Sequence, residues 1–373
     1  MTARVLGAAV LVAVLLLLPA AAVAQEQPVD TSELEQAWEQ LQEQYGQYLP
    51  EFSWQDLGAT VDFRGLVSGL ARYLFHQVWA NASLLGQLVI LAVLSALIKN
   101  LQSSFSSQGV AQVSRAVIIM VLLTMSTYSF SLAVNLARQT VQAMTGLIIS
   151  LVPVMLTLLV ALGSVTAATA FQPVLFTATA LVGTVVSNIV LPLLFAAAVL
   201  AVVNQMVQGI EINKLAGLLK DLAVWLLGFL LTVFVGVTVI NGAVAAVTDG
   251  VALRTGKFAA KTLIPVVGGM FSDAFETVAG AALVLKSSIG LFGVIALVVS
   301  CFFPVLKLFA ITLIYRGTAA LLQPLGEDAV SDTLEIMARY MYAVIGAVAA
   351  VGLMFFMLIT IMVAAANLPT MLR

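Results

Sequence analysis

Residues 289–314, IGLFGVIALVVSCFFPVLKLFAITLI, decide the fold class of this chain. The run is longer than the roughly 20 apolar residues that a helix needs to cross a bilayer, and Lys307 is its single charged residue. The rest of the chain is similar in character. Of its 373 residues, 62% are hydrophobic and 9% are charged, whereas soluble domains have about 25% charged residues. This composition excludes a water-soluble enzyme and predicts an all-α polytopic membrane protein.

Other runs of the same kind occur along the chain, and we expect about seven transmembrane helices in all. The candidates are residues 82–98, 116–136, 144–163, 174–203, 222–247, 289–314 and 341–366. Pro192 and Pro304 lie inside two of these runs, where a missing N–H group predicts a kink. Residues 204–221 read as an amphipathic connector. Together these segments form a polytopic domain over residues 81–373.

The N-terminal residues 1–24 have the three parts of a secretory signal peptide. A basic residue precedes an apolar stretch, Pro19 ends this stretch, and the small residues Ala22 and Ala24 form the cleavage pattern. Cleavage would make Gln25 the first residue of the mature chain and place it on the non-cytoplasmic side. An uncleaved anchor is the alternative, which Pro19 and the alanines disfavour.

Residues 25–80 form an acidic extracytoplasmic segment in which we expect amphipathic helices. One apolar stripe at helical spacing consists of Leu34, Trp38, Leu41 and Tyr45. A solvated helix is the favoured interpretation of this charge run, and a docking surface for a partner outside the membrane is the alternative. Residues 63–80 are expected to lie along the membrane surface.

The positive-inside rule orients the spans. With the mature N-terminus outside, residues 99–115 and 248–288 and the terminal Arg373 fall in the cytoplasm. The basic residues of the second loop are Arg254, Lys257, Lys261 and Lys286. The opposite loop, residues 315–340, carries four acidic and two basic residues. Signal peptide and loop charges therefore predict the same orientation.

Residues 262–285 do not fit this scheme simply. They are apolar, but Pro265, Gly268 and Gly269 break the helical pattern. A full crossing would move the acidic 315–340 loop to the cytoplasm. We therefore expect a re-entrant or surface-lying segment, covered by other parts of the protein.

Charged residues at membrane depth are the candidate site. Asp273 and Glu276 share a helix face, and Lys261 and Lys286 flank them. Lys307 lies in an apolar run, where a buried charge costs at least about 2.5–3.5 kcal/mol. Asp273 and Glu276 are either interfacial residues that pair with these two lysines or, with them, part of a polar path or a contact to a partner subunit. Lys307 is expected to snorkel, or to face such a polar path or another protein.

Polar residues without charge also occur in or at the ends of the spans. Asn188, Asn204 and Asn241 are expected to form hydrogen bonds between helices.

Motifs for catalysis or cofactor binding are missing from the sequence. A single His excludes an HExxH metal site, and a single Cys excludes an internal disulfide. Residues 250–257 resemble a P-loop, but five residues instead of four separate the glycines, and Phe258 follows the lysine. We therefore expect no enzyme activity, no cofactor and no metal. A net charge of −2 gives no reason to expect nucleic-acid binding.

Two adjacent strings resemble one family. KTLIPVVGGMFSDAFETVAGAALVLKSSIG at 261–290 and GLFGVIALVVSCFFPVLKLFAITLIYR at 290–316 resemble the stage III sporulation protein AE family of endospore-forming bacteria. The resemblance implies a permease-like subunit of the outer forespore membrane, made in the mother cell. It also implies a channel or secretion-like complex between the two cells, with ring-forming proteins and a separate ATPase as partners. Such a complex would maintain the forespore and support its late gene expression.

A stand-alone secondary transporter of a small solute is the alternative function. Polar groups near Gly/Pro breaks are typical of transporter sites, and Asp273 or Glu276 would then lie near a coupling-ion site.

Overall fold

A computed structural model describes residues 32–46, 63–81, 108–161, 165–206, 212–263, 268–325 and 328–371, with scattered positions between 83 and 97. These residues are almost entirely helical and contain no strand, which confirms the all-α class for the described part. The helices are α2 (Ser32–Tyr45), α3 (Phe63–Ala80), α5 (Gln108–Ala161), α6 (Val165–Val185), η4 (Val186–Val190), α7 (Leu191–Met206), α8 (Asn213–Leu263), α9 (Gly268–Leu322), η5 (Gln323–Leu325) and α10 (Asp328–Met371).

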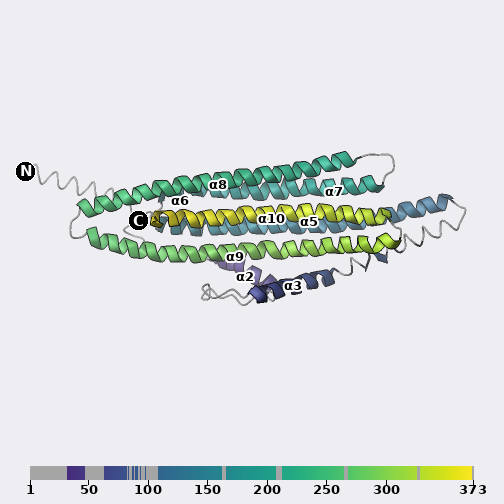
Figure 1. Ribbon diagram of the computed structural model, residues 1–373, viewed down its shortest axis with the longest axis horizontal. Helices are drawn as coiled ribbons and strands as arrows, with labels where there is room; N and C mark the ends of the chain where they lie inside the picture. The colour runs from purple at the N-terminus through teal and green to yellow at the C-terminus, as the bar shows by residue number, and fades with distance from the viewer. Residues whose placement is uncertain are drawn as a thin grey trace, which may run out of the picture.

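The long helices form one elongated bundle. Figure 1 shows α5 to α10 side by side with nearly aligned axes, and α2 and α3 along the outer side of α9. Within the described residues, five segments are long and apolar enough to cross a membrane. They are Leu123–Val160, Phe171–Asn204, Asn213–Val244, Ile289–Leu322 and Val330–Ala364.

The predicted spans 116–136 and 144–163 are one continuous helix, α5, so the prediction of two spans here is wrong. Polar residues between the two apolar runs suggested a loop. The helix accommodates them: Thr140 donates to the Leu136 carbonyl at 2.8 Å, and Arg138 projects from the bundle surface. The predicted span 82–98 is described only at scattered positions, and the signal peptide lies outside the described residues. Both remain predictions.

The predicted span 174–203 is confirmed as Phe171–Asn204, but it is not a uniform α-helix. A π-helical turn, η4, separates α6 from α7 and ends just before Pro192. Proline has no N–H group, and its ring clashes with the carbonyl four residues earlier, here that of Asn188. One wider turn relieves this clash without ending the helix.

The predicted spans 222–247, 289–314 and 341–366 correspond to the remaining three apolar segments, in α8, α9 and α10. Most of the expected connector 204–221 is helical, because α8 already begins at Asn213.

The segment 262–285 was expected to re-enter the membrane or lie on its surface, and this prediction is wrong for the described residues. From Gly268 onward the segment continues without a turn into the apolar part of α9. At 1.5 Å per residue α9 is about 80 Å long, nearly twice the about 40–45 Å of a bilayer with headgroups. The α8–α9 hairpin therefore projects well beyond the membrane.

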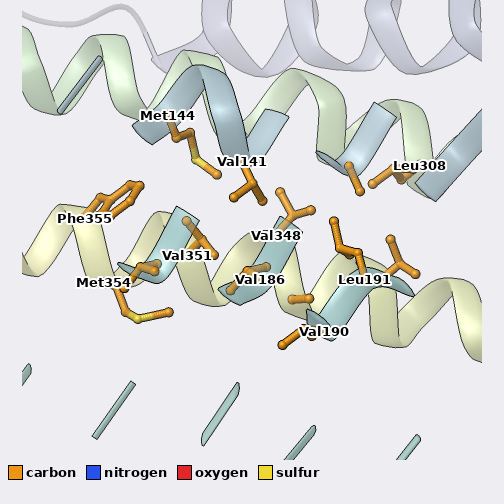
Figure 2. Close-up of a cluster of buried hydrophobic side chains, with 14 of the residues drawn as sticks. Val141, Met144, Val186, Val190, Leu191, Leu308, Val348, Val351, Met354 and Phe355 are labelled. Atoms are coloured by element: carbon orange, nitrogen blue, oxygen red, sulfur yellow. The ribbon is translucent and has the colours of Figure 1, made fainter. Parts of the chain in front are cut away.

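The core is made of aliphatic and aromatic side chains from all elements between α5 and α10 except η5. Figure 2 shows Val141 and Met144 of α5 near Val348 and Val351 of α10, with Val186 of η4 beside them. Small residues let the helices approach closely: a Cβ on Gly352 would lie 2.8 Å from the Cys301 sulfur. Close packing of this kind is what associates helices in lipid, where no hydrophobic force acts between them.

Candidate functional site

A belt of basic and aromatic residues surrounds one end of the apolar bundle. The Lys220 ammonium lies 5.7 Å from the centre of the Tyr340 ring, and the Arg316 guanidinium lies 6.0 Å from that of Tyr342. In the next turn, Arg339 pairs with Glu335 at 3.4 Å. Basic side chains with tyrosines are typical of the membrane–water interface.

Apart from Lys307, the next charged residues along α8 and α9 lie at the distance of the opposite interface. The α9 segment from Lys286 to Arg316 is about 45 Å long, and the α8 segment from Asp221 to Asp249 about 42 Å. Both lengths match a bilayer with its headgroups, about 40–45 Å. We therefore place the bilayer between these levels, with its midplane near Cys301.

The contacts between α9 and α5 show which residues of α5 lie at the same depth. Gly293 of α9 faces Leu151 of α5, and Cys301 and Met144 both lie near Gly352, so the two helices run antiparallel with Met144 at the level of Cys301. Arg138 lies as far along α5 from Met144 as Lys307 lies along α9 from Cys301. Both cations are therefore about 9 Å from the midplane, inside the hydrocarbon layer of about 30 Å.

Arg138 is held by the π-helical turn. Its guanidinium donates to the Asn188 Oδ1 at 2.5 Å, and both side chains are exposed on the bundle surface. The wider turn of η4 is where Asn188 sits, so a backbone irregularity and an intramembrane charge coincide. Such turns occur frequently at functional sites. A guanidinium has five donors, and Asn188 provides one acceptor.

Sequence reasoning missed Arg138, because it placed this residue in a loop between two spans. It expected hydrogen bonds between helices from three asparagines, and this is confirmed for Asn188. Asn204 accepts from the Ile212 N–H at 2.6 Å, which ties the end of α7 to the start of α8. The expectation is wrong for Asn241, whose amide donates to the Val237 carbonyl in its own helix.

Lys307 projects from the side of α9 that receives the N-terminal helices. One turn earlier, Phe303 stacks on Tyr45 of α2 at a centroid distance of 4.5 Å and meets Tyr73 of α3 edge-on at 4.8 Å. These three rings are buried. Tyr73 therefore packs against α9 instead of facing a membrane surface. The residues of α3 that are exposed include Phe75 and Trp79.

The residues predicted around 261–286 lie far from Arg138 and Lys307. Lys261 is in the last turn of α8, while Asp273, Glu276 and Lys286 are in the first half of α9; only their backbone is described. Lys307 is about 46 Å along α9 from Glu276, so the five residues do not form one site.

The predicted helix break at 265–269 coincides with the end of the hairpin. α8 ends at Leu263, and Gly268 and Gly269 are the first residues of α9. Pro265 lies outside the described residues, as do Ala22, Ala24 and Gln25 of the predicted cleavage site.

Comparison with known proteins covers nearly the whole chain. The family described as stage III sporulation protein AE matches residues 48–366. A curated relative, stage III sporulation protein AE of Bacillus subtilis (strain 168), is 36% identical over 354 residues, which cover 92% of this chain and 88% of the relative. No solved structure matches. The chain therefore belongs to the stage III sporulation protein AE family, and a role in sporulation follows from this membership.

Proposed function

We propose that this protein is the permease-like membrane component of a channel or secretion-like complex between mother cell and forespore. The complex maintains the forespore and supports its late gene expression. The observation that carries the proposal is the combination of family membership with a five-helix apolar bundle that holds charged residues inside the bilayer. Charges at this depth are expensive, and they are typical of ion and substrate pathways.

We place the subunit in the outer forespore membrane, as the family resemblance implies, and orient it there by its charges. Five crossings put the start of α5 and the end of α10 on opposite sides (Figure 1). The basic residues of the α8–α9 hairpin and Arg373 favour the cytoplasm for one side. The mature N-terminus is then outside the cytoplasm, as the signal peptide predicts, and residues 82–98 need not cross.

The two ends of the bundle have different proposed partners. Ring-forming proteins of the stage III complex would meet the extracytoplasmic end, and a separate ATPase would meet the cytoplasmic end, where the α8–α9 hairpin projects. The subunit itself acts without enzyme activity and binds no nucleic acid.

The test is an in-frame deletion in the native host, complemented from a mother-cell promoter or from a forespore promoter. We expect forespore volume and a late forespore reporter to fall after engulfment, and only mother-cell expression to restore them. Normal spores with a normal reporter would overturn the proposal.

Transport of a small solute by this protein alone is the second candidate. The π-helical turn beside Pro192 favours it, since interrupted helices with polar groups are typical of secondary transporters. It requires solute uptake by the purified protein in liposomes, whereas the complex-subunit proposal predicts none without partners.

A further inference from the structure

Helix α2 lies against the bundle at the depth of the membrane centre. Tyr45 stacks on Phe303, which is about 3 Å from the level of Cys301 at the midplane. Leu41, one turn earlier, packs both on this aromatic cluster and on the main core. The helix contacts both α5 and α9, so it covers the junction of two membrane-spanning helices.

The outward side of α2 is strongly polar. The exposed residues that the structure describes are Gln36, Glu39, Gln40, Gln42 and Glu43. Glu39 is about 9 Å along the helix from Tyr45. Whatever the tilt of α2, the last four of these residues therefore lie within the hydrocarbon layer, which extends about 15 Å from the midplane.

This polar surface of α2 cannot face lipid. Two carboxylates and three amides in one short stretch would be left without hydration or partners in hydrocarbon, and such groups face water-filled cavities or other proteins instead. Lys307 emerges from α9 one turn from Phe303, so a third charged group belongs to the same side.

Helix α8 shows what a lipid-compatible surface of this bundle looks like. It buries 22% of its apolar span, against 50–56% for the other four. At midplane depth its exposed residues include Phe229, Val233 and Val237, and the hydroxyl of the exposed Thr232 donates to the Gly228 carbonyl of the same helix. The bundle therefore has an apolar side on α8 and a polar side on α2. The neighbouring α3 exposes Phe75 and Trp79 and, beside them, Arg72 and His76, so exposed polar side chains extend from α2 onto α3.

We propose that the outward surface of α2, with Lys307 beside it, lines a water-filled space at the centre of the membrane. The inference rests on the proposed channel function and deepens it, because it assigns the side of the subunit that faces the aqueous path. The surface is acidic on α2, so hydrated cations and neutral polar solutes are the chemical classes that it would admit most readily.

The test is the reactivity of single cysteines in the full chain, in membranes prepared from sporulating cells. Cys301→Ala removes the only native thiol. Gln40→Cys and Glu43→Cys then report on α2, and Val233→Cys is the control at similar depth on α8. With a charged, membrane-impermeant thiol reagent, we expect the two α2 cysteines to react at least tenfold faster than the control.

A second measurement checks that α2 is docked when it reacts. In a separate chain of the same background, Leu41→Cys and Val299→Cys leave the Tyr45–Phe303 stack in place and should be joined by a short bifunctional thiol reagent, because both residues belong to the same apolar cluster. We expect this crosslink, together with fast reaction of Gln40→Cys and Glu43→Cys in their own chains. A crosslink together with Gln40→Cys and Glu43→Cys chains that react as slowly as the control overturns the inference, because lipid or protein then covers the surface. Absence of crosslinking also overturns it, because α2 is then not at this depth.

These failures are separable from failure of the proposed function. Variants that still complement the deletion but have unreactive α2 cysteines contradict the inference of a water-facing α2 surface and leave the proposed channel function intact. A deletion without a forespore phenotype contradicts the channel proposal, however fast the α2 cysteines react.

Discussion

The Arg138 guanidinium and the Asn188 side-chain oxygen, 2.5 Å apart, join α5 to the π-helical turn inside the hydrocarbon layer. Neither residue is needed to fill the core, because both are exposed on the bundle surface. The pair is costly to place in a membrane and partly compensated by one charge-assisted hydrogen bond. Stability alone does not account for such a charge, and this makes Arg138 a functional candidate.

Arg138→Leu separates function from stability. Replacing an exposed intramembrane cation by an apolar side chain removes its insertion cost, so we expect unchanged protein levels and a melting temperature that is equal or higher. Sporulation should nevertheless fall at least tenfold. The measurement is spore count against membrane-protein level in a complemented deletion strain.

Arg339→Leu is the matched control, because this arginine is in the interfacial belt and pairs with Glu335 in an exposed i,i+4 bridge. Such bridges contribute little, and near wild-type sporulation is expected. Equal sporulation by both variants would show that the intramembrane charge has no special role.

Gly183→Ala tests the contact between α5 and α6. A Cβ there would lie 2.5 Å from the Thr145 hydroxyl oxygen, and Thr145 is held in place because its side chain is branched and donates to the Val141 carbonyl at 2.7 Å. We expect a loss of about 1–3 kcal/mol, typical of overpacking, seen as a lower melting temperature in detergent.

Thr145→Ala should restore most of that loss in the double variant, because it removes the clashing atoms. Gly228→Ala on α8 is the control, since nothing lies within 4 Å of its Cβ position. If the double variant is as unstable as Gly183→Ala alone, α5 and α6 do not contact each other through Gly183 and Thr145, and the prediction is wrong.

The number of crossings gives a topology prediction. With five spans, a reporter that fluoresces only in the cytoplasm should be bright when fused after Arg373 and dark when inserted at residues 326–327. An insertion at residues 264–267, the hairpin end, should be bright. Bright signals at both hairpin end and 326–327 would contradict the arrangement of α9 as one full crossing.

Composition and apolar runs alone were enough to predict the helical class and most spans. They failed where a helix exceeds the membrane. Nothing in the residues around Arg138 or after Gly268 shows whether a helix continues, because helix propensity is a weak guide that tertiary packing overrides. This is why α5 was divided and why the first half of α9 was assigned to a separate segment.

The site was only partly predictable for the same reason. Lys307 stands out in sequence as an isolated charge in an apolar run. The partnership of Arg138 with Asn188 is between residues distant in the chain and depends on a π-helical turn, which Pro192 hints at but does not specify. The polar surface of α2 was visible as an acidic stretch, but its depth follows only from the Tyr45–Phe303 stack.

Asp273→Asn combined with Glu276→Gln tests the projecting hairpin. The structure puts both residues in the part of α9 before the apolar span, so they are outside the bilayer and their neutral forms should not alter insertion. If the hairpin docks a cytoplasmic partner, the double variant keeps normal protein levels and melting temperature while sporulation falls. Lower salt should strengthen a charge-dependent contact, so recovery of the partner with the wild-type protein should decrease as salt is raised. Unchanged sporulation at normal protein level would remove these two carboxylates from consideration, because neither folding nor partner binding would then depend on their charge.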